Sequence, residues 1–182
     1  MSKRSWAIAV IVVAQSMLLM GMIAKKQYTL SMGTPILLKT QPVDPRSLFR
    51  GDYVRIRYDI DQLDRKLPGV KAGFQKGDTI YVVLVKDERY WRAVSAHPNK
   101  LKLPQGQIAI RGEVRNAQSY RSDIWVSYGI NTYFVPEGEG RKLERPQEGD
   151  VVDIEVAIDE NGDAAIRALL LNGKRVFAET LF

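Results

Sequence analysis

The chain has 182 residues, of which 45% are hydrophobic, and a formal net charge of +6. This composition provides enough apolar material for one folded domain and argues against a disordered chain. There is no cysteine and a single histidine, His97, which excludes a thiol nucleophile, a disulfide, an iron–sulfur cluster and a cysteine-bound zinc. We therefore expect no metal and no cofactor.

The N-terminus carries an apolar run. Residues 6–24 read WAIAVIVVAQSMLLMGMIA, without a charge, and lie between two basic pairs, Lys3-Arg4 and Lys25-Lys26. As a helix the run measures about 28 Å, close to the thickness of one hydrocarbon core. A cleaved signal peptide is the alternative, but the triplet Met22-Ile23-Ala24 has a bulky residue where the cleavage pattern requires a small one. A buried core helix is disfavoured because no polar stripe interrupts the run.

The apolar run predicts the domain organisation. We expect a cytoplasmic tail and a transmembrane anchor in residues 1–26, followed by an extracytoplasmic domain in residues 27–182. The two basic pairs nearly balance the positive-inside count, but a long C-terminal domain translocates largely regardless of charge. We therefore expect one span with the C-terminal domain outside.

The remainder of the chain has the patterns of β-strands. Residues 79–85, TIYVVLV, are apolar on both faces, which predicts a strand in the middle of a sheet. Three further segments alternate apolar and polar side chains, which is typical of strands with one buried face: residues 56–60, 124–130 and 152–158.

Turn signals complete the predicted fold. Asn161-Gly162 and Asn172-Gly173 favour the positive φ angles of tight hairpins, so residues 151–178 are predicted to form a three-stranded meander. Short helical turns are expected only at residues 44–49 and 138–145. The predicted fold class is therefore mostly β: one antiparallel, barrel-like domain with short helical turns, behind an N-terminal transmembrane helix.

A Gly-Asp pair leads into a predicted strand at three places: residues 51–52, 77–78 and 149–150. Glycine accepts unusual backbone angles and aspartate bonds the backbone two residues further on, so turn construction explains the pair. Asp52 is accordingly predicted to be a turn residue rather than a catalytic carboxylate.

The strands after the first and third pairs carry opposite charges. Arg55 and Arg57 point outward in the first, where the third has Asp153 and Glu155. Because opposite charges across paired strands are stabilising, we predict that these two strands pair.

Residues 51–58, GDYVRIRY, resemble the signature that names the GDYXXLXY family of bacterial membrane-anchored proteins of unknown function, with Ile56 in place of leucine. Residues 42–50 and 133–140 also resemble that family's pattern. The resemblance implies an inner-membrane protein of the bacterial envelope with a periplasmic domain, working beside multi-span membrane proteins. It implies no reaction.

The signature region supplies the candidate interaction residues. Four charged side chains lie within nine residues of each other: Asp44, Arg46, Arg50 and Asp52. This density suits a network of ion pairs that holds the loop rigid. Tyr53 and Tyr58 lie on opposite faces of the predicted strand, so at most one of them is in the core. The region is either a folding motif or a partner-binding edge built from Tyr53, Arg55 and Arg57, since tyrosine and arginine are common interface anchors. The full set is Asp44, Arg46, Arg50, Gly51, Asp52, Tyr53, Arg55, Arg57 and Tyr58.

Two classes of function are compatible with these features. The first is a binding or adaptor module for another membrane protein. The second is an envelope hydrolase, because residues 47–54 are similar to the stretch after the nucleophile in signal-peptidase-like serine proteases. In that alignment Val43 takes the place of the nucleophilic serine and Ser47 lies four residues late. An enzyme is therefore disfavoured, and no catalytic residue is assigned.

Charge is distributed unevenly. Residues 25–136 hold 19 Lys and Arg against 10 Asp and Glu, whereas residues 137–182 hold 6 against 11. A basic surface beside a membrane can attract anionic lipid headgroups, although a mixed solvated surface is an equal alternative. Nucleic acid is an unlikely partner, because the sequence lacks an aromatic stacking platform.

Overall fold

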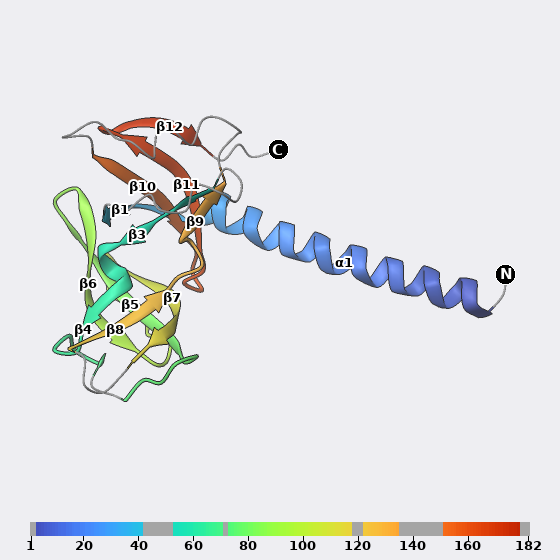
Figure 1. Ribbon diagram of the computed structural model, residues 1–182, viewed down its shortest axis with the longest axis horizontal. Coiled ribbons are helices and arrows are strands. Elements are labelled where there is room, and N and C mark those ends of the chain that lie inside the picture. Colours follow the sequence, from blue (N-terminus) through green and yellow to red (C-terminus); the bar gives the residue numbers. More distant parts are fainter. Residues whose placement is uncertain (1–2, 42–52, 71–72, 118–121, 135–150, 179–182) are drawn as a thin grey trace.

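The computed structural model describes residues 3–41, 53–70, 73–117, 122–134 and 151–178. Figure 1 shows one long helix, α1, projecting from a β domain. Helix α1 spans Lys3–Met32. The strands are β1 (Thr34–Gln41), β2 (Tyr53–Arg55), β3 (Arg57–Tyr58), β4 (Gln62–Asp64), β5 (Thr79–Asp87), β6 (Tyr90–His97), β7 (Gln107–Asn116), β8 (Asp123–Ser127), β9 (Thr132–Phe134), β10 (Val152–Ile158), β11 (Ala164–Leu171) and β12 (Lys174–Ala178). The 3₁₀ turn η1 spans Asp59–Asp61.

The strands form two five-stranded antiparallel sheets and a short ribbon. The first sheet has the order β12-β11-β10-β1-β3, the second β4-β8-β7-β5-β6, and the ribbon pairs β2 with β9. The second sheet curls into a nearly closed barrel (Figure 1). The predicted fold class, a mostly β antiparallel domain behind one apolar helix, is confirmed. The helical turns predicted at residues 44–49 and 138–145 lie outside the described residues.

The chain crosses from one sheet to the other at the signature. β3 pairs with β1 at the edge of the first sheet, η1 follows directly, and β4 then pairs with β8 at the edge of the second sheet. The alternation predicted for residues 56–60 holds at the level of burial, because Ile56, Tyr58 and Ile60 are all buried. The strand itself is broken, since residues 59–61 form the 3₁₀ turn.

One hydrophobic core lies between the sheets. It joins Ile36 and Leu38 of β1 and Ile154 and Val156 of β10 to side chains of the second sheet such as Leu84. Removing these apolar surfaces from water is the main contribution to stability, at about 25 cal/mol per Å² of apolar area.

The predicted meander is present, but only its second connection is the tight turn expected, because five residues, 159–163, join β10 to β11 and Asn161 does not have a positive φ. β10, β11 and β12 form the three-stranded meander expected for residues 151–178. Both residues of its second turn have positive φ, 52° at Asn172 and 79° at Gly173, as a type I′ turn requires. β5, whose residues are apolar on both faces, lies between β7 and β6, so its predicted interior position is also confirmed.

The predicted pairing of the two oppositely charged strands is wrong. β2 pairs with β9, β3 pairs with β1, and β10 pairs with β1 and β11, so the strand of Arg55 and Arg57 never lies beside that of Asp153 and Glu155. The sequence analysis did not recognise β1, which lies between β3 and β10. Each acidic residue instead pairs elsewhere: Asp153 with Arg89, and Glu155 with Arg175.

Asp153 connects the two sheets. Its side chain is fully buried, with Oδ2 2.7 Å from a guanidinium nitrogen of Arg89 and Oδ1 accepting a hydrogen bond of 2.8 Å from the Tyr90 hydroxyl. We expect Asp153→Ala to lower the free energy of unfolding by about 1–3 kcal/mol, because it leaves a tyrosine hydroxyl without its acceptor. Urea denaturation measures the change. Asp87→Ala is the matched control, because it removes an exposed ion pair with Arg92 and should cost less than about 1 kcal/mol. Equal losses in the two variants would contradict the prediction.

Candidate functional site

The second half of the signature is held by backbone contacts on both sides. Tyr53, Val54 and Arg55 pair with Phe134, Tyr133 and Thr132 of β9. The pairing continues past the end of β2, because the amide of Ile56 donates to the carbonyl of Asn131 at 2.9 Å. The chain then changes partner, and Arg57 and Tyr58 pair with the end of β1.

Two buried tyrosines fasten the signature segment to the loop after β8. Tyr58 donates its hydroxyl to the carbonyl of Ile130 at 2.8 Å, and Tyr128 donates its hydroxyl to the carbonyl of Ile60 at 2.7 Å. Each tyrosine therefore bonds the backbone of the segment that carries the other, an arrangement we call the tyrosine clasp (Tyr58, Ile60, Tyr128, Ile130). Burial raises the pKa of both phenols well above the usual value, so both hydroxyls remain donors.

Gly112 of β7 makes room for the clasp. A β-carbon at this position would lie 2.9 Å from Cδ1 of Tyr128, closer than real contacts allow. The missing side chain lets the Tyr128 ring lie directly over the strand, which is a use of glycine that the sequence pattern alone does not reveal.

Asp61 lies beside the clasp as a buried carboxyl group. It is 4% exposed, and Oδ2 accepts hydrogen bonds of 3.0 Å from the Tyr58 amide and from Nδ2 of Asn131. Among the described residues Oδ1 is buried without a hydrogen-bond partner. Burial raises the pKa of Asp61 to about 6, although the two hydrogen bonds and the charge of Arg57 act in the opposite direction.

The sequence analysis missed Asp61, Tyr128 and Asn131. Asp61 follows Tyr58 by three residues, the spacing at which an aspartate side chain bonds a preceding amide at a helical turn, and this was the available signal. Tyr128 belongs to the alternating strand predicted at residues 124–130, which ends just before Asn131, and only the fold brings both residues against the signature.

The structure describes the side chains of two of the predicted interaction residues, Arg57 and Tyr58. Tyr58 is in the core. Arg57 is exposed, with its guanidinium carbon 5.9 Å from the centroid of the Trp125 ring, a cation–π distance. The side chains of Tyr53 and Arg55 lie outside the described part of the chain, as do Asp44, Arg46, Arg50, Gly51 and Asp52. The ion network proposed for these residues stays a prediction.

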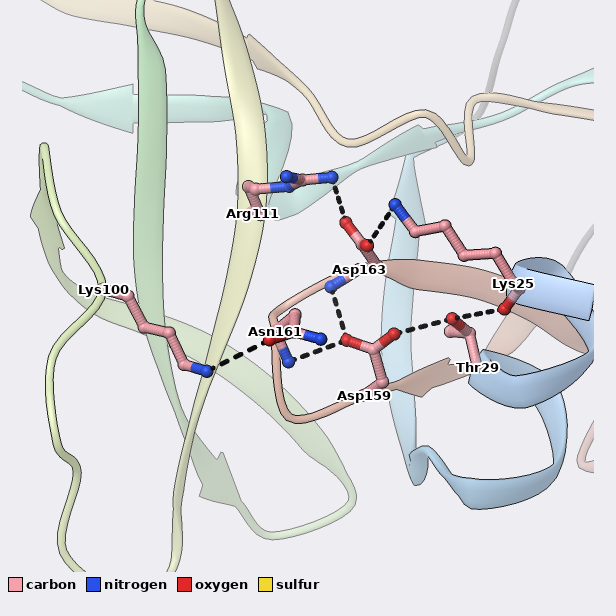
Figure 2. A network of polar contacts seen from close by, with 7 residues as sticks. All are labelled: Lys25, Thr29, Lys100, Arg111, Asp159, Asn161 and Asp163. Carbon is pink, nitrogen blue, oxygen red and sulfur yellow. Dashed lines mark hydrogen bonds and ion pairs between the residues drawn. The ribbon is translucent and has the colours of Figure 1, made fainter. Parts of the chain in front are cut away.

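A second polar cluster joins α1 to the β domain (Figure 2). Thr29 donates its hydroxyl to Oδ2 of Asp159 at 2.7 Å, and Nζ of Lys25 lies 2.7 Å from Oδ2 of Asp163. Arg111 of β7 pairs with the other oxygen of Asp163. The two acids, Asp159 and Asp163, flank the β10–β11 turn. Oδ1 of Asp159 accepts hydrogen bonds from the amides of residues 161 and 163. The turn therefore closes around the carboxylate that also accepts the hydrogen bond from Thr29.

Gly33 makes the junction between α1 and β1 tight. Its amide donates to the carbonyl of Thr29 at 3.0 Å, and a β-carbon would collide with that carbonyl and lie 3.0 Å from the amide of Ile158. Thr29 and Leu30 are buried at the same place. The helix therefore enters the domain without a flexible linker.

The sequence profile of the GDYXXLXY protein family matches residues 15–169. The chain belongs to this family. The match begins within α1, ends in β11 and includes the clasp, Asp61 and the helix–domain joint. The resemblance found in residues 51–58 is thereby confirmed. No curated protein and no solved structure matches the chain.

The described part of this GDYXXLXY protein contains no group of three His, Asp or Glu side chains placed to hold a metal ion. His97 lies at the end of β6 with Nε2 3.0 Å from the hydroxyl of Ser95. Ser47 and Val43, on which the hydrolase alternative depends, lie outside the described residues, so that alternative stays open.

The raised pKa of Asp61 predicts a pH-dependent stability. The unfolded chain should release this proton near pH 3.8 and the folded protein near pH 6, so burial of the neutral acid is favourable at low pH. The free energy of unfolding should therefore fall as pH rises from about 4 to 6, by about 3 kcal/mol in total from this group. Asp61→Asn should flatten the profile over this range in urea denaturation. An unchanged profile in Asp61→Asn would contradict the assignment.

The tyrosine clasp predicts non-additive mutations. Tyr58→Phe and Tyr128→Phe each leave a buried carbonyl without its donor, which should cost about 1–3 kcal/mol of unfolding free energy. Because both bonds join the same two segments, the double variant should lose at least 0.5 kcal/mol less than the two single losses combined. Denaturation of the three variants measures the coupling, with Tyr81→Phe on β5 as the control for a lost hydroxyl at a half-exposed site. Strict additivity would show that the two bonds act independently.

Proposed function

We propose that this protein is a membrane-anchored binding module of the bacterial envelope. In this proposal α1 crosses the inner membrane, the β domain lies on the periplasmic side, and the domain binds another integral membrane protein. Helix α1 supports the anchor: it contains an 18-residue window of mean hydropathy 2.3 of which none is buried against the protein. Such a helix is long and apolar enough to span a bilayer.

The observation that carries the proposal is the rigid joint between α1 and the β domain. Eight residues of the helix, 25–32, continue past the apolar run and end on β10 and β11, where Thr29, Lys25 and Gly33 hold them. A domain that only needed a tether could use a flexible linker. A rigid joint fixes the height and orientation of the domain above the bilayer, which suits recognition of a partner that is itself held in the membrane.

Anionic lipid headgroups are a second, weaker contact in this proposal. Lys25 and Lys26 lie at the end of the apolar run, where each cation near an anionic surface contributes about 1 kcal/mol. Lys25 is 60% exposed although it pairs with Asp163. Headgroup contacts would add to the orientation set by the joint.

Crosslinking in native membranes tests the proposal. The full chain, carrying a photo-crosslinking amino acid at Arg57, should yield a defined adduct with an integral membrane protein after irradiation. Combining Thr29→Val with Asp163→Asn loosens the joint without removing the helix, and should reduce the adduct several-fold because the orientation of the domain is no longer fixed. Mass spectrometry identifies the adduct and gel densitometry measures its yield.

Two controls make the outcome decisive. Glu113→Gln removes an exposed ion pair with Arg115 at residues that take no part in the joint, and should leave the yield unchanged. Alkaline carbonate should leave the wild-type protein in the membrane pellet. A mature chain that begins near Lys25 and is released by buffer would refute the anchor, and failure to crosslink any membrane protein from several surface positions would refute the binding function.

A further inference from the structure

A cleft lies where the second sheet fails to close. Its volume is about 580 Å³, and it is lined by residues of β4 on one side and by residues 90–93 of β6 on the other. β4 and β6 are the two edge strands of the sheet, and Figure 1 shows them side by side on the side of the domain away from α1. The cleft is therefore the open seam of the barrel.

The strand directions at the seam suit one additional strand. β4 is antiparallel to β8, β8 to β7, β7 to β5 and β5 to β6. Four reversals leave β4 and β6 running in the same direction. A strand inserted between them would be antiparallel to both and would complete an all-antiparallel barrel.

One end of the seam is already covered by the chain itself. The amide of Ala96, in the second half of β6, donates to the carbonyl of Pro68 at 2.9 Å, and Gly69 packs so closely on Ala96 that a β-carbon would collide with the carbonyl there. The covered part shows that the outer edge of β6 can donate a backbone hydrogen bond to another segment, here the turns of residues 65–69. The part that lines the cleft, residues 90–93, offers room for about four residues, or roughly 13 Å of strand.

The side chains that line the cleft indicate which kind of added strand would fit it. Leu63, Leu67 and Trp91 form an apolar floor that packs on the core. The rim carries four carboxylates, Asp59, Asp64, Asp87 and Glu88, against two basic side chains, Lys39 and Arg92. This local excess of negative charge stands out in a chain whose net charge is +6, and it complements a basic ligand.

We propose that the seam between β4 and β6 binds an extended segment of a partner protein in which apolar and basic side chains alternate. Backbone hydrogen bonds to the two edge strands provide affinity, apolar side chains enter the floor, and basic side chains meet the rim carboxylates. This inference rests on the proposed binding function and names the segment that the module recognises. The seam lies on the far side of the domain from the anchor, so the segment belongs to an extracytoplasmic part of the partner.

The test uses the full chain in detergent micelles and a fluorescent peptide of alternating valine and lysine, six residues long, with blocked ends. Fluorescence anisotropy should show saturable binding. Hydrogen–deuterium exchange should show new amide protection at residues 62–64 and 90–93. A peptide with glutamate in place of lysine should bind at least tenfold more weakly, as should the valine–lysine peptide methylated at alternate backbone nitrogens, which cannot form the ladder.

Charge reversal on each wall provides the variants. Asp64→Lys on β4 and Glu88→Lys at the β5–β6 turn should each weaken peptide binding about tenfold, equivalent to about 1.4 kcal/mol. Glu160→Lys makes the same charge change at an exposed position of the β10–β11 turn and should have no effect. Unchanged melting temperatures show that the variants fold. Because the two substitutions lie on opposite walls of the cleft, one variant that folds is sufficient to test whether the rim charge contributes to peptide binding.

Several outcomes would overturn the inference. Equal binding of the methylated peptide would show charge attraction without strand addition, and absent binding or absent protection at the seam would show that the cleft is not the site. The same charge reversals in the native-membrane crosslinking separate this inference from the proposed function. If the membrane adduct persists at wild-type yield in both variants, the seam is not the binding surface and the binding function stands. If the wild-type chain forms no adduct, the binding function itself fails.

Discussion

The fold of this GDYXXLXY protein depends on the point at which the chain leaves one sheet for the other. β3 ends the first sheet and β4 begins the second, with only the three residues of η1 between them. A crossing this short has few backbone hydrogen bonds of its own. The tyrosine clasp adds hydrogen bonds from the side chains of Tyr58 and Tyr128 to the backbone. Buried side-chain bonds of this kind hold one arrangement firmly, because any other arrangement leaves polar groups unsatisfied.

This constraint explains two positions of the signature. Its final tyrosine, Tyr58, is a core residue with a specific acceptor, and Ile56, in the leucine position, is buried in the same cluster. Asp61 adds a buried carboxyl group whose neutral form is favoured below pH 6. These positions therefore build the crossing, whereas Arg57 faces solvent over Trp125. The described residues thus give the signature a structural role, and its described charged side chain, Arg57, is exposed.

Sequence patterns predicted the parts of the fold that rest on local rules. Period-two alternation and the turn at Asn172-Gly173 identified the meander, and the apolar run of β5 identified an interior strand. These patterns failed where the structure depends on contacts between segments that are far apart in the sequence. β1 was not recognised, and its insertion between β3 and β10 made the charge-pairing prediction wrong. The clasp was missed for the same reason, since Tyr58 and Ile130 meet only through the topology. Gly112, whose missing side chain accommodates Tyr128, has no local sign in the sequence.

β1 links the two features from which function is inferred. It begins directly after the joint at Gly33, and Lys39, five residues beyond Thr34, lines the seam between β4 and β6. Five residues of strand measure about 16 Å, and pairing with β10 from Thr34 to Lys39 keeps this stretch extended and in register. A rigid helix, a tight junction and a paired strand thus form one continuous element from the anchor to the cleft. In a protein anchored by α1, that element would hold the seam at a fixed distance from the bilayer, as the proposed binding of a partner's extended segment requires.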